Sequence, residues 1–205
     1  MEKIDAKTLK SGILSGFCLS IGAIAYLKAG SVTGAVLFAF GLATIVSFRW
    51  NLFTGMAGFT TRDGIPRLFA VLVFNAVGCG LGALCVSSVP EIRQASADIV
   101  ANRCAAGPFS CFMLSILCGF IMTASVKFAR KGNWLPLVLG IPAFIISGLP
   151  HCVADTFYLS ACGIETLAVN WKMLSVVYPM EVLGNFVGCN LYRIGPDLEP
   201  SVKNS

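Results

Sequence analysis

Ser147-Gly148-Leu149-Pro150-His151-Cys152-Val153-Ala154-Asp155 contains the only histidine of this 205-residue chain and lies within a long apolar stretch, 134–158. Proline has no amide hydrogen and its ring clashes with the preceding turn, so Pro150 predicts an interrupted helix. At membrane depth an interruption is tolerated only where protein or a water-filled cavity surrounds it. An ionisable residue at that depth is a candidate functional residue. His151 therefore indicates transport of something that carries or accepts a proton.

The composition is that of an integral membrane protein. Hydrophobic residues make up 56% of the chain and charged residues only 12%, with a mean hydropathy of +0.80. Soluble domains carry roughly twice that charged fraction, about 25%. We expect one all-α transmembrane domain over residues 1–205, with tails at 1–10 and 194–205 and no cleavable signal peptide. The nine cysteines lie mostly in apolar runs without a Cys-x-x-Cys pair, which predicts packing residues and neither a metal site nor a cofactor.

Six segments are long enough to cross a bilayer core, which requires about 20 apolar residues. They are 11–29, 33–60, 67–89, 108–130, 134–160 and 172–193, joined by polar connections at 61–66, 90–107, 131–133 and 161–171.

The distribution of Lys and Arg predicts that both termini are cytoplasmic, in the cell (inner) membrane. The net charge of +5 is interpreted as this topology signal and not as a nucleic-acid surface. With the N-terminus inside, the cytoplasmic side holds Lys3, Lys7, Lys10, Arg62, Arg67, Lys127, Arg130, Lys131, Arg193 and Lys203, the outer side holds Lys28, Arg93, Arg103 and Lys172, and Arg49 lies within a span.

A short internal repeat relates the third and sixth segments. Asn75-Ala-Val-Gly78-Cys79-Gly80 corresponds to Asn185-Phe-Val-Gly188-Cys189-Asn190, although glycine-rich helix packing could produce the same match by chance. Three spans in each half predict halves of opposite orientation, as in many transporters, with interrupted second and fifth spans. We interpret the glycines as sites of close helix approach and the two asparagines as local hydrogen-bonding or helix-capping residues. These glycines are Gly78, Gly80, Gly82, Gly184 and Gly188.

The second span is interrupted at Arg49-Trp50-Asn51-Leu52-Phe53-Thr54-Gly55. This stretch predicts either a loop inside the span, with Leu52 and Phe53 as apolar gates, or an interfacial anchor, since Trp and Arg favour the headgroup region. The separation of Lys28 from Arg62 favours the loop, because a straight helix would need fewer residues to cross.

Three further charged residues have alternative interpretations. Asp155, one helical turn after His151, could orient or charge the imidazole, or it could be solvated at the outer end of the span. Glu181 and Lys127 lie near span ends, where interfacial placement is the default.

Together these stretches resemble the motifs of the formate/nitrite transporter family. Asn51–Gly55 resembles its acidic-Leu-Phe-Thr-Gly loop, and 147–155 resembles its Ser-Gly-Phe-Glu-His-Ser-x-Ala-Asn segment. Gly184-Asn185-Phe186-Val187-Gly188 resembles its Gly-Asn-x-x-Gly motif, which 74–78 matches in the third span. The four matches occur in the family's order over essentially the whole chain.

The resemblance implies an aquaporin-like fold, a homopentamer with one pore per protomer, and passage of small monovalent anions together with a proton. It implies that His151 is the central pore histidine and that Asn51, Leu52, Phe53 and Thr54 form the pore loop. By the same resemblance Phe144 matches an aromatic residue at the outer constriction, and Val126 matches an apolar residue that helps to close the pore.

The chain departs from the family pattern beside the pore. Asn51 replaces an acidic residue, Pro150 replaces the glutamate before the histidine, and Asp155 replaces an asparagine. Thr123 stands where an asparagine near the histidine is usual, and Lys127 follows one turn later. These changes alter the electrostatics of the pore, so the resemblance predicts the fold more firmly than the substrate.

Three other functions compete with an anion channel. A channel for neutral solutes of the aquaporin type should contain Asn-Pro-Ala repeats, which the chain lacks. An intramembrane enzyme could use Cys152, His151 and Asp155, but adjacent helical residues point about 100° apart, so Cys152 and His151 pair poorly. A purely structural role leaves both interrupted spans unexplained.

Overall fold

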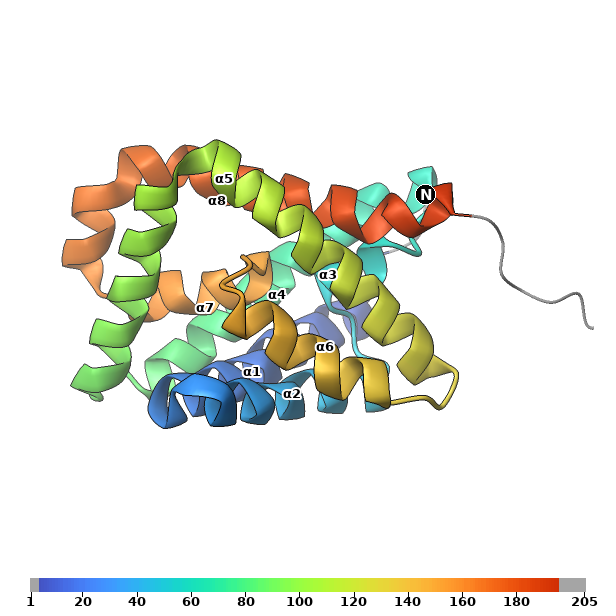
Figure 1. The fold of residues 1–205 in the computed structure, drawn as a ribbon, viewed down its shortest axis with the longest axis horizontal. Helices are drawn as coiled ribbons and strands as arrows, with labels where there is room; N and C mark the ends of the chain where they lie inside the picture. Colours follow the sequence, from blue (N-terminus) through green and yellow to red (C-terminus); the bar gives the residue numbers. More distant parts are fainter. Residues whose placement is uncertain (1–3, 196–205) are drawn as a thin grey trace, which may run out of the picture.

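The computed structural model describes residues 4–195 and contains only helices in that range. Figure 1 shows long helices running along the molecule, with short helices between them. The elements are α1 (Ala6–Ala29), α2 (Ser31–Ser47), α3 (Phe53–Ala57), η1 (Arg62–Gly64), α4 (Ile65–Cys85), α5 (Pro90–Arg130), α6 (Leu135–Ile146), α7 (Cys152–Ala161), α8 (Ile164–Asn190) and η2 (Leu191–Ile194).

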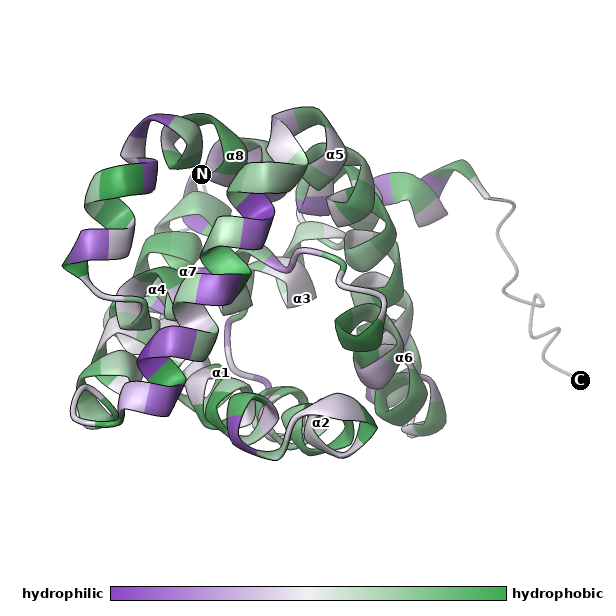
Figure 2. Ribbon diagram, turned by 60° about the vertical axis from the view of Figure 1, so that its left-hand side comes forward, coloured by the Kyte–Doolittle hydropathy of each residue, from purple (hydrophilic) through white to green (hydrophobic). Residues whose placement is uncertain are grey.

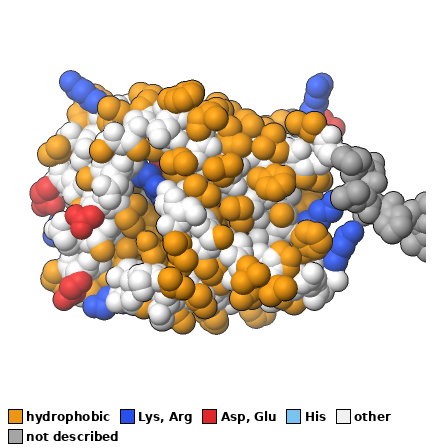
Figure 3. Space-filling model, in the orientation of Figure 1, with side chains coloured by type: hydrophobic (Ala, Val, Ile, Leu, Met, Phe, Trp, Pro, Cys, Tyr) orange, Lys and Arg blue, Asp and Glu red, His pale blue; other side chains and the backbone are white. Residues whose placement is uncertain are grey.

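The surface is apolar between two charged ends. Hydrophobic side chains cover the middle of the face in Figure 3, while most Lys, Arg, Asp and Glu side chains lie toward its left and right ends. Within residues 4–195, three helices are long and apolar enough to cross a membrane: Ala6–Ala29, Arg62–Cys85 and Pro90–Arg130. Ser31–Ser47 and Leu135–Ile146 are shorter apolar helices. A bilayer core requires such an apolar band.

Two short helices lie inside a ring of longer ones. Figure 2 shows α3 and α7 within the ring formed by α1, α2, α4, α5, α6 and α8. In this ring α1 packs on α2 and α4, α5 packs on α8 and α6, and α2 packs on α6. The chain reaches each short helix through a non-helical stretch, 48–52 before α3 and 147–151 before α7.

Several expected boundaries were wrong. The stretch 90–107, expected to be a polar connection, is helical and is joined to the rest of α5 across a kink at Gly107 (φ 79°). This stretch is amphipathic: Ile92, Ser96 and Val100 are buried, whereas Glu91 and Asp98 are exposed. Its buried side packs against the rest of the protein. Most of the expected connection 161–171 likewise belongs to α8.

Helices extend into both expected tails. The first helix begins at Ala6, where Asp5 accepts a hydrogen bond from the Thr8 amide at 2.8 Å and caps it. The helix η2 extends to Ile194, and the remainder of the expected C-terminal tail, 196–205, lies outside the described residues.

Each short helix is held by one buried asparagine. The Asn75 side-chain oxygen accepts from the Phe53 amide at 2.9 Å, and its nitrogen donates to the carbonyls of Gly12 (2.8 Å) and Asn51 (3.0 Å). The amide at the start of α3 and a carbonyl of the preceding loop therefore have partners, as buried backbone groups require.

Asn185 repeats this arrangement in the second half of the chain. Its oxygen accepts from the Cys152 amide at 2.8 Å, and its nitrogen donates to the carbonyls of Ser115 (2.9 Å) and Pro150 (3.0 Å). The hydrogen bonds of Asn75 and Asn185 thus have the same pattern, one amide accepted and two carbonyls satisfied.

Glycines allow matching pairs of helices to touch. A Cβ atom at Gly78 would lie 2.0 Å from the Ile13 carbonyl oxygen, and one at Gly188 would lie 2.0 Å from that of Ile116. Gly82 and Gly184 also face close neighbours, which agrees with the expected packing role. Gly80 is the exception, because a Cβ there would meet no atom within 4 Å, so the expectation of close packing at Gly80 was wrong.

Two thiols tie the halves together. Cys79 of α4 donates to the Val153 carbonyl of α7 at 3.4 Å, and Cys189 of α8 donates to the Thr54 carbonyl of α3 at 3.4 Å. Thus α4, which follows α3 in the chain, contacts α7, and α8, which follows α7, contacts α3.

Candidate functional site at the junction of α3 and α7

His151 is the residue that precedes α7 and caps it. Its backbone is extended (φ −118°, ψ 105°), and its Nδ1 accepts a hydrogen bond from the Ala154 amide at 3.1 Å. The side chain is only 1% exposed. Because Nδ1 is an acceptor, the proton of the neutral ring lies on Nε2.

The imidazole joins the two short helices. Its Nε2 lies 2.9 Å from Oγ1 of Thr54, a fully buried residue of α3. With the proton on Nε2, the ring donates this hydrogen bond to the threonine hydroxyl. Residues 97 positions apart in the chain thereby meet at one polar contact among apolar neighbours.

Aromatic rings cover the histidine on one side. The Phe144 ring stacks on the imidazole with centroids 5.6 Å apart and planes 19° apart, and Phe38 meets Phe144 edge-on at 6.1 Å. Phe144 was expected beside the pore, but Phe38 was not identified from the sequence. It lies in an uninterrupted apolar run of α2, where no local signal separates it from packing residues.

The residues at the start of α3 contact different neighbours. Leu52 occupies the capping position of α3, which His151 occupies for α7, and is 2% exposed. The Phe53 ring packs on Phe69 of α4 with centroids 6.2 Å apart. Val126 of α5 approaches the start of α3, since a Cβ at Gly55 would lie 3.9 Å from its side chain.

Asn51 and Thr123 form hydrogen bonds to helices instead of to His151. The Asn51 side chain donates to Ser11 Oγ of α1 at 2.7 Å, and Thr123 donates to the Cys189 carbonyl of α8 at 3.0 Å. Both ring nitrogens of His151 already have the partners given above. In this structure Asn51 and Thr123 therefore hold the helices around the site.

A cavity of about 380 Å³ opens beside the histidine. We call it the Arg103 cavity, because Arg103 is its cation. The sequence did not identify this arginine as a site residue, because the stretch 90–107 was interpreted as a polar connection on the outer side. The other lining residues include Tyr26, Phe38, Phe144, Gly148, His151, Asp155 and Tyr158.

Arg103 binds α7 and the non-helical stretch that precedes it. Its Nε donates to Asp155 Oδ2 at 2.9 Å, and its Nη1 donates to the Gly148 carbonyl at 2.7 Å. Gly148 adopts φ 67°, a conformation that a glycine reaches without strain. Asp155 is 4% exposed, and its carboxylate pairs with the arginine while its amide donates to the His151 carbonyl at 2.9 Å.

The charged residues with open alternatives lie in distinct places. Lys127 lies over the Tyr192 ring, 4.9 Å from its centroid, and Arg49 lines an open cleft beside the start of α1. Glu181 is 2% exposed, so its expected interfacial placement was wrong. Arg49 has φ 54°, which is uncommon for a residue other than glycine.

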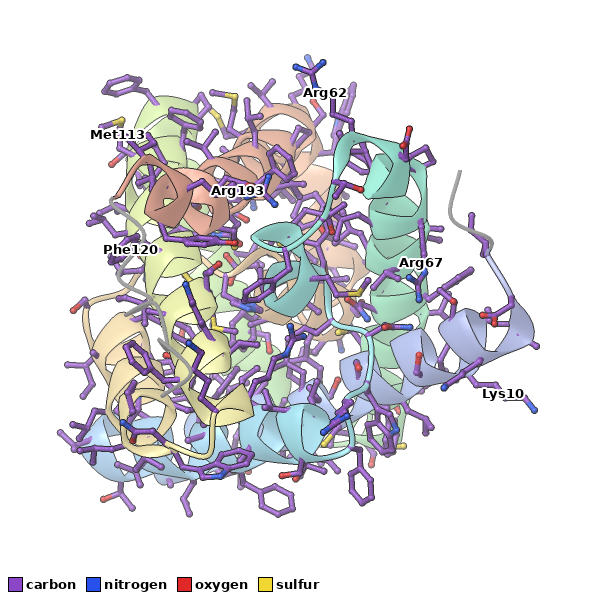
Figure 4. All side chains as sticks on the ribbon, turned by 90° about the vertical axis from the view of Figure 1, so that its right-hand side faces the viewer. Lys10, Arg62, Arg67, Met113, Phe120 and Arg193 are labelled. Carbon is purple, nitrogen blue, oxygen red and sulfur yellow. The ribbon has the colours of Figure 1, made fainter. Side chains whose placement is uncertain are left out.

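Figure 4 looks onto the end of the molecule where α1 begins and η2 ends. Lys10 and Arg62 point away from the protein there, whereas Arg193 lies against the segment that follows α3. Arg193 donates to the carbonyls of Gly58 (2.9 Å) and Thr60 (2.8 Å). Within residues 4–195, no three His, Cys, Asp or Glu side chains are placed to hold a metal ion.

Comparison with known proteins agrees with this arrangement. A model of the formate/nitrite transporter family matches residues 3–194. Among solved structures, the chain is similar to a pentameric formate channel with formate bound (TM-score 0.71, 14% identity, covering 91% of this chain and 91% of that one). It is also similar to an ion channel of the same family (TM-score 0.75, 21% identity, covering 90% of this chain and 86% of that one). A search of proteins of curated function found no match.

The fold is thus the all-helical fold of these channels, in a multi-pass membrane protein, and the relatives are transport proteins and not enzymes. The family match covers the paired motifs around Asn75 and Asn185 and the histidine between α6 and α7. The chain belongs to the formate/nitrite transporter family.

Proposed function

We propose that the chain forms a homopentameric channel for small monovalent anions of weak acids, such as formate or nitrite, with a pore in each protomer. Family membership supports an anion channel, and the similar solved structure is a pentameric formate channel with formate bound. The observation that carries the proposal is the contact of Thr54 with His151 beside the Arg103 cavity. In this arrangement a cation lies beside a cavity that leads to a buried, titratable ring.

We further propose that the two halves are an inverted repeat around this contact. The matching hydrogen bonds of Asn75 and Asn185 and the reciprocal contacts of Cys79 and Cys189 support this interpretation. Halves of opposite orientation place two half-helices near the middle of the membrane, where transporters bind their substrates. Both termini would then lie on the cytoplasmic side of the cell membrane.

The physical problem for such a pore is desolvation. Arg103 is neutralised by its ion pair with Asp155, and passage of a small anion past apolar groups as a charged species is unfavourable. We assign that apolar barrier to Leu52, Phe53, Val126 and Phe144. Carboxylic acids titrate at about pH 4 in water. A proton that the anion takes up at the apolar barrier removes its charge where its hydration is lost. Imidazole is the side chain suited to supply it.

The hydrogen bonds of His151 limit how a proton can pass. In the neutral ring Nδ1 accepts from Ala154 and Nε2–H donates to Thr54. A relay requires Nδ1 to take up a proton, which breaks the α7 cap because two donors would face each other. The imidazolium can then give its Nε2 proton to the anion, which leaves a neutral ring and a neutral acid. Without a relay, Nε2–H acts by donating a hydrogen bond to the passing anion.

The test is flux of formate and of nitrite into proteoliposomes at two pH values. We expect His151→Phe to change the pH dependence of the protein-mediated flux, and His151→Gln, which stays polar but cannot titrate, to change it in the same way. Empty liposomes correct for permeation of the neutral acid. A wild-type pH dependence in both variants would overturn the role of the histidine, and flux of neutral solutes without anions would favour an aquaporin-like channel.

A further inference from the structure

Glu181 of α8 is a buried acidic residue that the proposed pore does not use. It is 2% exposed, and its Oε1 has no hydrogen-bond partner among the described residues. A buried carboxylate oxygen that accepts no hydrogen bond loses its hydration without full compensation by the protein. Its position in the middle of a long helix therefore requires an explanation.

The nearest cation is already engaged. Arg103 Nε lies 3.9 Å from Glu181 Oε1, beyond hydrogen-bond distance, whereas it lies 2.9 Å from Asp155 Oδ2. The Nη1 of the same guanidinium donates to the Gly148 carbonyl. One arginine thus stands beside two buried carboxyl groups, and its short contact is with Asp155.

The other groups that face Glu181 carry no positive charge. The Cys111 thiol donates to the Arg103 carbonyl at 3.4 Å, and the Tyr178 hydroxyl pairs with that of Thr156 at 2.7 Å. The titratable groups around Glu181 besides Arg103 and Asp155 are Cys104 and Cys111 of α5, Cys152 and Tyr158 of α7, and Tyr178 of α8 itself.

If both carboxyl groups were ionised, the cluster of Arg103, Asp155 and Glu181 would bury a net charge of −1. An uncompensated buried charge is strongly unfavourable. A single proton removes it, and the more weakly paired carboxyl group is the one to take it. We propose that Asp155 and Glu181 form a proton-binding site in which Glu181 holds the proton and Asp155 remains paired with Arg103.

The site has a consequence for permeation, and this part rests on the proposed anion channel. Arg103 and Asp155 line the same cavity as His151. With Glu181 protonated, the cluster is neutral and does not repel an anion in the cavity. When Glu181 ionises as the pH rises, the cluster becomes negative, and anion entry falls.

The proton itself is tested without transport, by infrared difference spectroscopy of the protein in lipid. We expect a carbonyl-stretch band of a protonated carboxylic acid at neutral pH, sensitive to deuterium exchange, which disappears in Glu181→Gln. Asp155→Asn should also remove it, because Glu181 would then be the only carboxyl group beside Arg103 and would ionise. A purely structural Glu181 would not respond to Asp155→Asn in this way.

The matched control is Glu165→Gln on the same helix. Glu165 is exposed and pairs with Arg93 at 3.0 Å, so its removal should leave the band unchanged. Size-exclusion profiles and thermal unfolding establish that each variant is folded. Absence of the band in folded wild-type protein, or its persistence in Glu181→Gln, would overturn the proton site.

The second measurement is anion flux as a function of pH in proteoliposomes. Wild-type flux should fall several-fold as the pH rises through the loss of the infrared band, whereas Glu181→Gln should not show that fall. If the band is present but neither protein passes anions, the proton site stands and the proposed function fails. If flux is present with the same pH profile in both proteins, the effect of Glu181 on permeation is refuted.

Discussion

The loops before α3 and α7 have the same support but different chemistry. In both, a buried asparagine from a neighbouring long helix binds the first amide of the short helix and a carbonyl of the loop. The capping position is Leu52 in one loop and His151 in the other. Two residues later, Thr54 in one half corresponds to Val153 in the other.

This difference shows how a repeated scaffold can carry a unique site. The two asparagines make matching hydrogen bonds, and Gly78 and Gly188 occupy matching positions of close helix approach. The titratable ring occurs once, and the hydroxyl that binds it comes from the other half. A change to the shared scaffold should therefore affect both halves alike, while a change to the unique residues should not.

The largest effect is expected from Asn75→Leu and Asn185→Leu. Each removes three hydrogen bonds and leaves buried backbone groups without partners, so we expect each to lower the free energy of unfolding by about 3 kcal/mol or more. Thermal unfolding in detergent measures it. Gln94→Leu, which removes an exposed amide that bonds Asp98, is the control. A severe effect at only one asparagine would contradict the equivalence of the halves.

Alanine at Gly16 and at Gly119 should give the next largest effect. A Cβ would lie 2.0 Å from the Asn75 carbonyl oxygen in the first case and 2.3 Å from that of Asn185 in the second. Separating the helices should lower the free energy of unfolding by about 1–3 kcal/mol at each position. Gly80→Ala, where a Cβ meets open space, should change it little, and an equal loss at Gly80 would refute the packing explanation.

Substitutions at Thr54 and at the matching Val153 test the hydrogen bond between Thr54 and His151. Thr54→Val removes the hydroxyl that binds His151 Nε2, at a stability loss of about 1–2 kcal/mol, and should change the pH dependence of formate flux. Val153→Thr, at the matching position of the other half, should lower stability similarly but leave that pH dependence as in the wild type. Equal pH profiles for wild type and Thr54→Val would count against the role of this contact.

The smallest effect is expected from Cys79→Ala and Cys189→Ala. A thiol is a weak donor, and loss of each contact to the opposite short helix should lower the free energy of unfolding by about 1 kcal/mol. Chemical unfolding of the two variants in parallel measures whether the losses agree. A loss confined to one cysteine would mean that the reciprocal contacts are unequal.

Some of this arrangement could be predicted from the sequence. Proline, glycine and polar residues within apolar runs predict a change of backbone at Leu52 and His151, and each ends a non-helical stretch before a short helix. Arg103 and Glu181 could not be assigned in this way. Arg103 lies in a stretch predicted to be a polar connection, and Glu181 was interpreted as interfacial, so only the packing of 90–107 as a helix brings them together.

Phe38 and Asp155 illustrate the same limit. Nothing in the apolar run around Phe38 distinguishes the ring that meets Phe144 from rings that face outward, such as Phe40, which is 60% exposed. Asp155 has a helical neighbour at His151, but both nitrogens of that ring are engaged elsewhere. Its partner Arg103 is distant in sequence, and such a pairing is set by the tertiary fold.

By itself, the sequence determined the membrane class, the helical composition and the places of two non-helical stretches, 48–52 and 147–151, because hydropathy and missing backbone donors act locally. The resemblance of its motifs indicated the family. Only the tertiary structure decided which side chains meet: Thr54 with His151, Phe38 with Phe144, and Arg103 with two carboxyl groups. These contacts join distant segments, and the burial that gives them their electrostatic effect exists only once the helices have packed.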